Sequence, residues 1–112
     1  MRVGFDARWY NQSVVGSYIA GLLPALVRAG CELMVYIDRR NPVPGLDMPS
    51  VQTVPVSSAK YSPLATLEFR HLEKRDKLDV FHCPFYAAPL LNCPMVVTVH
   101  DLIPFLFPIY PW

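Results

Sequence analysis

The sequence predicts an α/β fold with a doubly wound, mainly parallel, Rossmann-like sheet of about five strands and helices on both faces. Short apolar runs rich in β-formers alternate with longer segments whose apolar residues recur at helical spacing. Strands joined by helices run parallel through right-handed crossovers. With 112 residues, of which 53% are hydrophobic and 17% charged, the chain can bury one core. We therefore expect residues 1–112 to form a single domain.

The first strand and the first helix are predicted within the first 30 residues. RVGFDA, residues 2–7, is a short apolar strand, and a loop containing one glycine follows over residues 8–16. From residue 17 to residue 29 the apolar side chains recur at helical spacing, with a serine as N-cap and Gly30 as the C-terminal stop. Pro24 lies inside this helix, so we expect a kink or an irregular first turn.

Two further strands and a second helix are predicted in the middle of the chain. LMVYI, residues 33–37, is typical of a strand buried on both faces. VQTVPV, residues 51–56, predicts a third strand, and its Pro55 favours an edge of the sheet because proline cannot donate to a neighbour. A serine–proline pair begins a helix over residues 62–76. We expect three leucines among its buried residues: Leu64, Leu67 and Leu72.

The last two strands are predicted at residues 79–82 and 95–99. The connection between them, CPFYAAPLLNCP, has room for one short helix. In open sheets of this kind, ligands bind beyond the carboxyl ends of the strands, near the point where the strand order reverses. This rule selects three segments: the loop after Ala7, the segment after His82, and the dipeptide His100-Asp101.

His100 and Asp101 are the candidate catalytic residues. A histidine at this position offers a base that titrates near neutral pH, beside a carboxylate. Adjacent residues of a strand point to opposite faces, so each side chain has its own partners. The alternative is that His100 is a structural residue at the end of a strand.

Gly16 and Ser17 are the candidate phosphate-binding residues. A glycine at the start of a helix lets backbone N–H groups approach a phosphate, and the helix dipole favours the negative charge. The GxGxxG fingerprint is absent, so a nicotinamide or flavin enzyme is not predicted. The alternative is that Gly16 only forms a turn and Ser17 only caps the helix.

No metal site is predicted. Four residues near the same edge lack the short spacing of structural zinc ligands: His82, Cys83, Cys93 and His100. The cysteines are odd in number and form no CxxC, which is typical of free thiols in a reducing cytosol. Three aromatic residues either stack on a sugar ring or pack in the core: Trp9, Phe85 and Tyr86.

The charge distribution argues against several classes of partner. The net charge is +1, and no basic run indicates nucleic acid or an anionic membrane. The first residues include one aspartate and two arginines where a signal peptide needs an apolar core. No apolar run approaches the roughly 20 residues that span a bilayer. We expect a cytoplasmic protein.

Several segments in this order resemble the N-terminal domain of family 4 glycosyltransferases: RVGFDAR, YIAGLLPALVRAG, DVFHCPFYAAPLL and PMVVTVHDLIPFLFP. The resemblance implies a retaining enzyme with two Rossmann-like domains, in which the N-terminal domain mainly binds the acceptor. The C-terminal, nucleotide-sugar-binding domain has no counterpart in this chain. By the same resemblance, the complete enzyme transfers a sugar to a glycan, lipid or small-molecule acceptor. It needs no essential metal and, in full length, is cytoplasmic or peripheral to a membrane.

The resemblance also implies roles for individual residues. His100 lies beside the donor sugar, and Asp101 orients it or the acceptor. Gly16, with Ser17, approaches the donor phosphates, although this chain reads VVG where many relatives have two adjacent glycines. Four residues are expected to contact the acceptor: Asp6, Arg8, His82 and Tyr86.

Two further expectations concern the chain as a whole. A free-standing Rossmann-like binding or scaffold module without catalysis is the alternative to an enzyme part. The tail LIPFLFPIYPW is strongly apolar, so we expect self-association through it. Under either interpretation, we expect the isolated 112-residue chain to be inactive.

Overall fold

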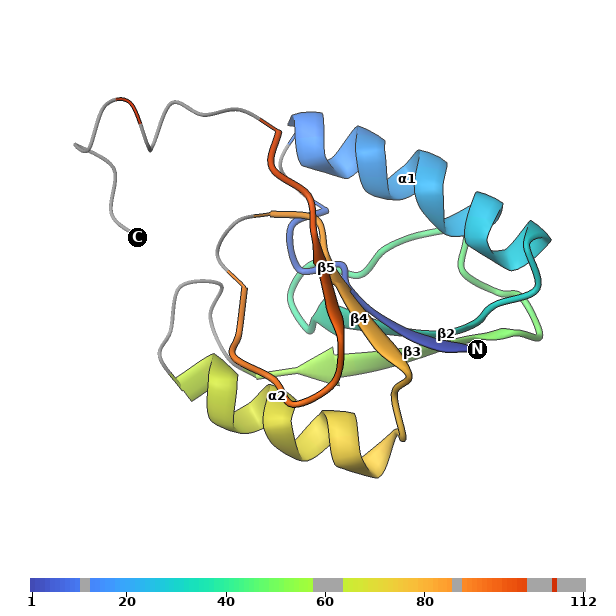
Figure 1. Ribbon diagram of the computed structural model, residues 1–112. Coiled ribbons are helices and arrows are strands. Elements are labelled where there is room, and N and C mark those ends of the chain that lie inside the picture. The colour runs from blue at the N-terminus through green and yellow to red at the C-terminus, as the bar shows by residue number, and fades with distance from the viewer. Residues whose placement is uncertain (11–12, 58–63, 86–87, 101–105, 107–112) are drawn as a thin grey trace.

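The computed structural model describes residues 1–10, 13–57, 64–85, 88–100 and 106. These residues form five strands and two helices (Figure 1). In chain order the elements are β1 (Arg2–Asp6), α1 (Ser13–Arg28), β2 (Glu32–Asp38), β3 (Val51–Val56), α2 (Leu64–Arg75), β4 (Val80–Cys83) and β5 (Met95–Val97). No helix in the described ranges is long and apolar enough to cross a membrane.

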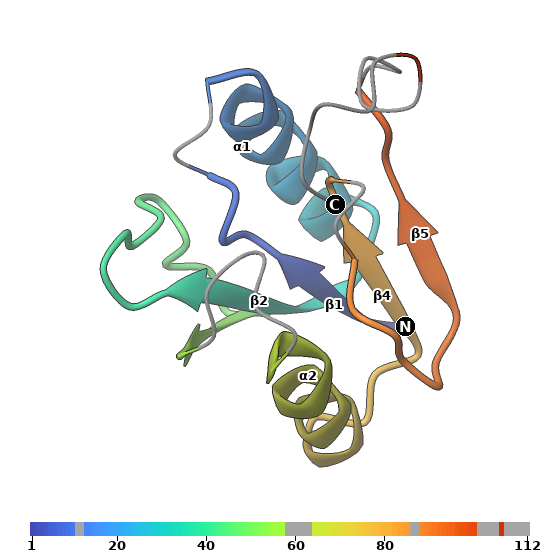
Figure 2. The same cartoon turned by 90° about the vertical axis from the view of Figure 1, so that its left-hand side faces the viewer.

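The five strands form one parallel sheet in the order β3-β2-β1-β4-β5. Strand β1 is central, and the chain builds outward from it first on one side and then on the other. Helix α1 covers one face and α2 the other (Figure 2). The predicted doubly wound parallel fold is therefore confirmed. Strand β3 lies at an edge as Pro55 indicated, and Pro55 is in register with Ile37 of β2.

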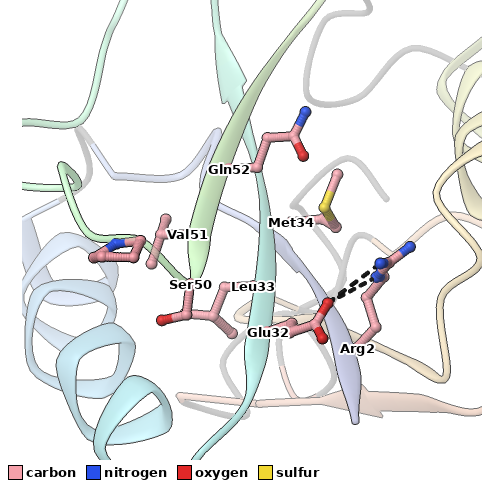
Figure 3. A pocket seen from close by; sticks show the side chains of 8 residues that line it. Arg2, Glu32, Leu33, Met34, Ser50, Val51 and Gln52 are labelled. Carbon is pink, nitrogen blue, oxygen red and sulfur yellow. Dashed lines mark hydrogen bonds and ion pairs between the residues drawn. The ribbon is translucent and has the colours of Figure 1, made fainter.

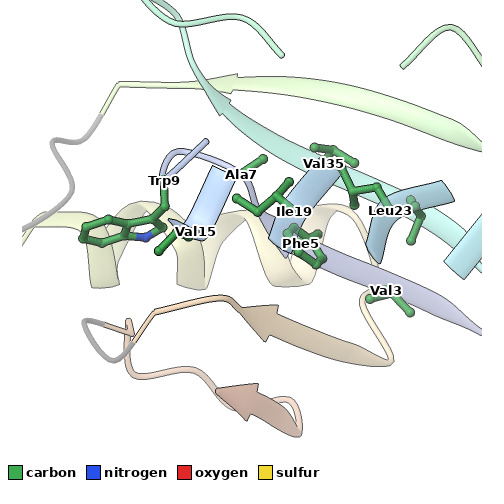
Figure 4. Close-up of a cluster of buried hydrophobic side chains, with 9 residues drawn as sticks. Val3, Phe5, Ala7, Trp9, Val15, Ile19, Leu23 and Val35 are labelled. Atoms are coloured by element: carbon green, nitrogen blue, oxygen red, sulfur yellow. The ribbon is translucent and has the colours of Figure 1, made fainter. Parts of the chain in front are cut away.

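Each face of the sheet buries its own apolar cluster, because successive strand residues point to opposite sides. On the α1 face, Phe5 and Val35 pack with Ile19 and Leu23 of the helix (Figure 4). On the α2 face, the cluster contains Met34, Tyr36, Phe69, Leu72 and Phe81. Burial of apolar surface stabilises a fold by roughly 25 cal/mol per Å², and these two clusters attach the helices to the sheet.

Helix α1 departs from the prediction at its start. It begins at Ser13, four residues earlier than expected, so Gly16 lies in its first turn rather than in a loop. Ser17 is consequently an internal residue and not the N-cap. The helix continues through Pro24 to Arg28. Packing of Ile19 and Leu23 against the sheet outweighs the poor helix propensity of glycine and proline.

Two of the three leucines predicted to be buried in α2 are exposed. Leu64 is 63% exposed and Leu67 65%, whereas Leu72 is buried. The buried residues of α2 are Ala65, Phe69, Leu72 and Glu73. The buried residues recur at 65, 69 and 72, and a turn of roughly 100° per residue places Leu64 and Leu67 away from that face.

Smaller differences concern the last strands and their connection. Strand β4 lies one residue later than predicted and β5 ends at Val97 rather than at Val99. The described part of the connection, residues 84–85 and 88–94, contains no helix. The carboxylate of Glu73 instead anchors it by accepting hydrogen bonds from the backbone N–H groups of Asn92 and Cys93.

Candidate functional site

The strands end at one edge of the sheet, which we call the carboxyl edge, at Asp6, Asp38, Val56, Cys83 and Val97. Three polar groups from separate elements meet there. The Tyr18 hydroxyl, from α1, lies 3.2 Å from Nε2 of His82 on β4 and 2.9 Å from Oγ1 of Thr98 after β5. Nε2 of His82 and Oγ1 of Thr98 are 3.2 Å apart. These atoms form a closed hydrogen-bonding triangle, and all three side chains are half-buried.

His100 lies next to this triangle. Its Nε2 is 2.8 Å from the carbonyl oxygen of Pro84, and its ring meets the Tyr18 ring edge-on, with centroids 5.0 Å apart. A carbonyl oxygen only accepts hydrogen bonds, so Nε2 of His100 carries a proton. In the neutral imidazole, Nδ1 then holds the lone pair and can accept a hydrogen bond from a ligand hydroxyl.

His82 is held as a neutral ring. Its imidazole stacks on Phe5 with centroids 4.9 Å apart and planes inclined by 14°. Burial lowers the pKa of His82 below its ordinary value of 6.5, because the charged form loses hydration. Near pH 7 the ring is therefore an uncharged member of the triangle.

Asp6 and Arg8, both predicted to contact an acceptor, bind each other. Nη2 of Arg8 donates to Oδ2 of Asp6 at 2.8 Å, and its Nε donates to Oδ1 at 2.9 Å. Asp6 is 0% exposed and Arg8 1%. The guanidinium also lies over the ring of Phe69, 4.7 Å from the centroid. Burial disfavours the charge on Arg8, but hydrogen bonding and the opposite charge of Asp6 outweigh it and raise the pKa of Arg8. The pair fixes the end of β1, and an acceptor contact there stays a prediction.

The residues predicted to bind phosphate lie in the first half of α1. Gly16 is buried against the backbone carbonyl of Tyr10, and Ser17 is exposed. Together with Tyr10 and Ala20 they line an open hollow of about 260 Å³. The first turn of a helix has backbone N–H groups without partners inside the helix, and it carries the positive end of the helix dipole. The hollow lies one turn into the helix from this end, and phosphate binding there stays a prediction.

The aromatic residues at this edge have different roles. Trp9 is fully buried and stacks on Phe85 with ring centroids 4.4 Å apart, so the packing alternative is correct for Trp9. Tyr86, predicted to contact the acceptor, and Asp101, predicted to be catalytic, lie outside the described residues.

No described group of three or more His, Cys, Asp or Glu residues is arranged to hold a metal ion. The three cysteines are free thiols. Cys83 is buried at the end of β4, and its thiol donates to the carbonyl oxygen of Phe85 at 3.1 Å. Burial raises the pKa of Cys83 to about 12, so this thiol is protonated at neutral pH and serves as a packing residue.

The opposite edge of the sheet carries a second hollow, of about 150 Å³ (Figure 3). It is lined by residues at the start of β1, β2 and β3, including Arg2, Glu32 and Ser50. The exposed ion pair between Arg2 and Glu32, 3.2 Å long, closes one side of it. Ligands of doubly wound sheets bind at the other edge, so the carboxyl edge is the candidate site.

Sequence reasoning missed Tyr18, Thr98 and the carbonyl of Pro84. The sequence does mark both side chains as candidates: Thr98 is the one hydroxyl residue in the apolar run VVTV, and Tyr18 follows Gly16 by two residues. Their meeting depends on the strand order, because Tyr18 and Thr98 are 80 residues apart.

The fold and the site define an α/β domain of the Rossmann-like class, with polar and imidazole groups gathered at the carboxyl edge of a parallel sheet. The chain matches the model of Glycosyltransferase Family 4 over residues 15–112. It therefore belongs to that family, as an N-terminal domain of a glycosyltransferase. The matched range contains Gly16, Tyr18, His82, Thr98 and His100. No curated protein matches the chain.

Proposed function

We propose that this domain is the acceptor-binding part of a retaining glycosyltransferase, which transfers a sugar from a nucleotide-sugar donor to a glycan, lipid or small-molecule acceptor. The observation that supports this most is the position of His100. Its imidazole is held at the carboxyl edge by the Pro84 carbonyl and by the ring of Tyr18, which belongs to the same helix as Gly16. The family match supplies the class of reaction.

In this proposal a second, C-terminal domain binds the nucleotide-sugar and presents it to the carboxyl edge. Transfer with retention develops positive charge on the sugar and negative charge on the leaving diphosphate. The start of α1, just before Gly16 and the exposed Ser17, stabilises the diphosphate through the helix dipole and the backbone N–H groups of the first helical residues. We expect no essential metal, because these fixed dipoles supply the electrostatic stabilisation.

His100 positions the sugar. The Nε2–H of His100 donates to the carbonyl oxygen of Pro84, so Nδ1 is the ring nitrogen left to bond a sugar hydroxyl, whose hydrogen bond it accepts when it carries no proton. A fixed acceptor of this kind reduces the orientations open to the bound sugar and so favours the reactive one. The role requires no net proton transfer, and we assign His100 as a positioning group rather than a general base.

The test uses the complete polypeptide that contains this domain, with UDP- and GDP-hexoses as donors and sugar transfer or donor hydrolysis as the readout. We expect His100→Ala to lower kcat/KM by roughly 100-fold, the size expected when a reacting group is misplaced by about 1 Å. His100→Asn keeps an acceptor near the position of Nδ1 and should lose less. Exposed His71 of α2 provides the control, since His71→Ala removes a histidine far from the edge.

Unchanged turnover in a folded His100→Ala variant would reject the assigned role. Absence of transfer and hydrolysis with every donor, in a protein that still binds sugars, would instead favour the non-catalytic binding module.

A further inference from the structure

We propose that Tyr18 is a positioning residue of the transfer reaction: its hydroxyl, anchored by His82 and Thr98, fixes its ring against His100, so that the imidazole keeps one orientation. This inference rests on the proposed function and names a residue that acts through His100. Tyr18 also lies two residues after Gly16, so the same helical turn connects the hollow at Gly16 with the His100 ring.

The anchoring of Tyr18 does not depend on which proton arrangement the triangle adopts. Tyr18 and Thr98 each bring one hydroxyl proton, and Nε2 of the neutral His82 ring either accepts or donates. Either tautomer allows two of the three edges to be hydrogen bonds at one time. Only one of the three edges, that between His82 and Thr98, does not involve Tyr18, so any two hydrogen bonds include at least one to Tyr18. The Tyr18 hydroxyl therefore keeps at least one bond in each arrangement.

The ring of Tyr18 transmits this anchoring to His100. The two rings meet at 81°, in an edge-to-face arrangement with centroids 5.0 Å apart. The bond from Nε2 of His100 to the Pro84 carbonyl fixes one side of the imidazole, and the tyrosine ring restricts rotation about that bond. Edge-to-face aromatic contacts have a preferred geometry, so they orient a ring as well as burying it.

The first experiment separates the hydroxyl from the ring in the complete enzyme. Tyr18→Phe keeps the ring and removes the anchor, and we expect kcat to fall by about 10-fold with little change in KM, because the sugar still binds but is less often oriented for reaction. Tyr18→Leu removes the ring as well and should approach the loss seen for His100→Ala. Thr98→Val should lower kcat less than Tyr18→Phe does, because the Tyr18 hydroxyl keeps its partner His82, and Thr98→Ser, which keeps the hydroxyl, should retain activity.

The decisive measurement is a double-mutant cycle. If Tyr18 acts through His100, then Tyr18→Phe has no further effect on kcat in a His100→Ala background. Full additivity of the two losses would overturn the inference while leaving the role of His100 intact. A His100→Ala variant with unchanged turnover would overturn both, so the two failures are distinguishable.

Tyr36→Phe is the matched control, because Tyr36 donates a buried hydrogen bond to Asp76 and touches neither His82 nor Thr98 in the described contacts. It should lower thermal stability without changing kcat. A second readout is independent of activity. In histidine NMR spectra of the protein, Tyr18→Phe should shift and broaden the ring signals of His100 and His82, and Tyr36→Phe should not. Unchanged His100 signals in Tyr18→Phe would also overturn the inference.

Discussion

The first turn of α1 packs directly on the loop before it: Gly16 lies against the backbone carbonyl of Tyr10 so closely that a Cβ atom at residue 16 would clash with the oxygen. The neighbouring atom belongs to the backbone, so it cannot move aside as a flexible side chain would. The absence of a side chain at residue 16 therefore lets the loop before α1 lie against the first turn of the helix.

Gly16→Ala should destabilise the domain by roughly 1–3 kcal/mol, the cost of forcing additional atoms into a packed region. Chemical denaturation followed by circular dichroism gives the free energy of unfolding. The same helix offers the control. A Cβ atom at Gly21 would meet no described atom within 4 Å, so Gly21→Ala should raise stability by about 0.5–1 kcal/mol through helix propensity. Equal effects of the two substitutions would show that contact with Tyr10 does not matter.

The buried pair of Asp6 and Arg8 gives a second prediction. Removing one partner leaves an uncompensated charge in the interior, so Asp6→Asn and Arg8→Met should each cost about 3–5 kcal/mol of unfolding free energy. The double variant should cost clearly less than the sum of the two, because it leaves neither charge behind.

The exposed pair of Arg2 and Glu32 is the comparison for this experiment. Glu32→Gln removes a solvent-screened interaction and should change stability by less than about 1 kcal/mol. If Asp6→Asn were as mild as Glu32→Gln, the interior pair would not be structurally important, and a direct role of Asp6 with an acceptor would gain weight.

The predictable part of the fold came from local patterns. Apolar β-rich runs located all five strands to within two residues, and Pro55 indicated the edge because a missing N–H has the same consequence in any sheet. The start of α1 was not predictable in this way, because two β-branched residues followed by a glycine, VVG, have low helix propensity yet lie in the first turn of the helix. Leu64 and Leu67 were predicted to be buried because two leucines three residues apart indicate one face of a helix, but this spacing does not show whether that face contacts the sheet or solvent.

The candidate site was predictable in position but not in composition. The carboxyl-edge rule placed His82 and His100 at the correct end of the sheet. Tyr18 and Thr98 join them only because β4 lies beside β1 and β5 beside β4, and that order is not encoded in any short segment. Asp6 and Arg8 look like ligand-binding residues in the sequence, yet two residues of opposite charge so near in the chain also satisfy each other.

The third prediction concerns acidic pH. Burial lowers the pKa of His82 in the folded state below 6.5, the value expected for the unfolded chain. As the pH falls through 6.5, His82 becomes protonated in the unfolded state while it stays neutral in the folded state. The free energy of unfolding should therefore be highest above about pH 6.5. It should decline below that pH until His82 is also protonated in the folded state.

Thermal melting between pH 7.5 and 5 in the wild type and in His82→Gln isolates this effect. Glutamine places a neutral amide near Nε2 of His82, where it can still reach Tyr18 and Thr98, but it does not titrate. The melting temperature of His82→Gln should fall less than that of the wild type, while His71→Gln, at an exposed position of α2, should follow the wild type. Carboxylate titration affects all three proteins alike, so parallel curves for the wild type and His82→Gln would mean that a different group carries the pH dependence.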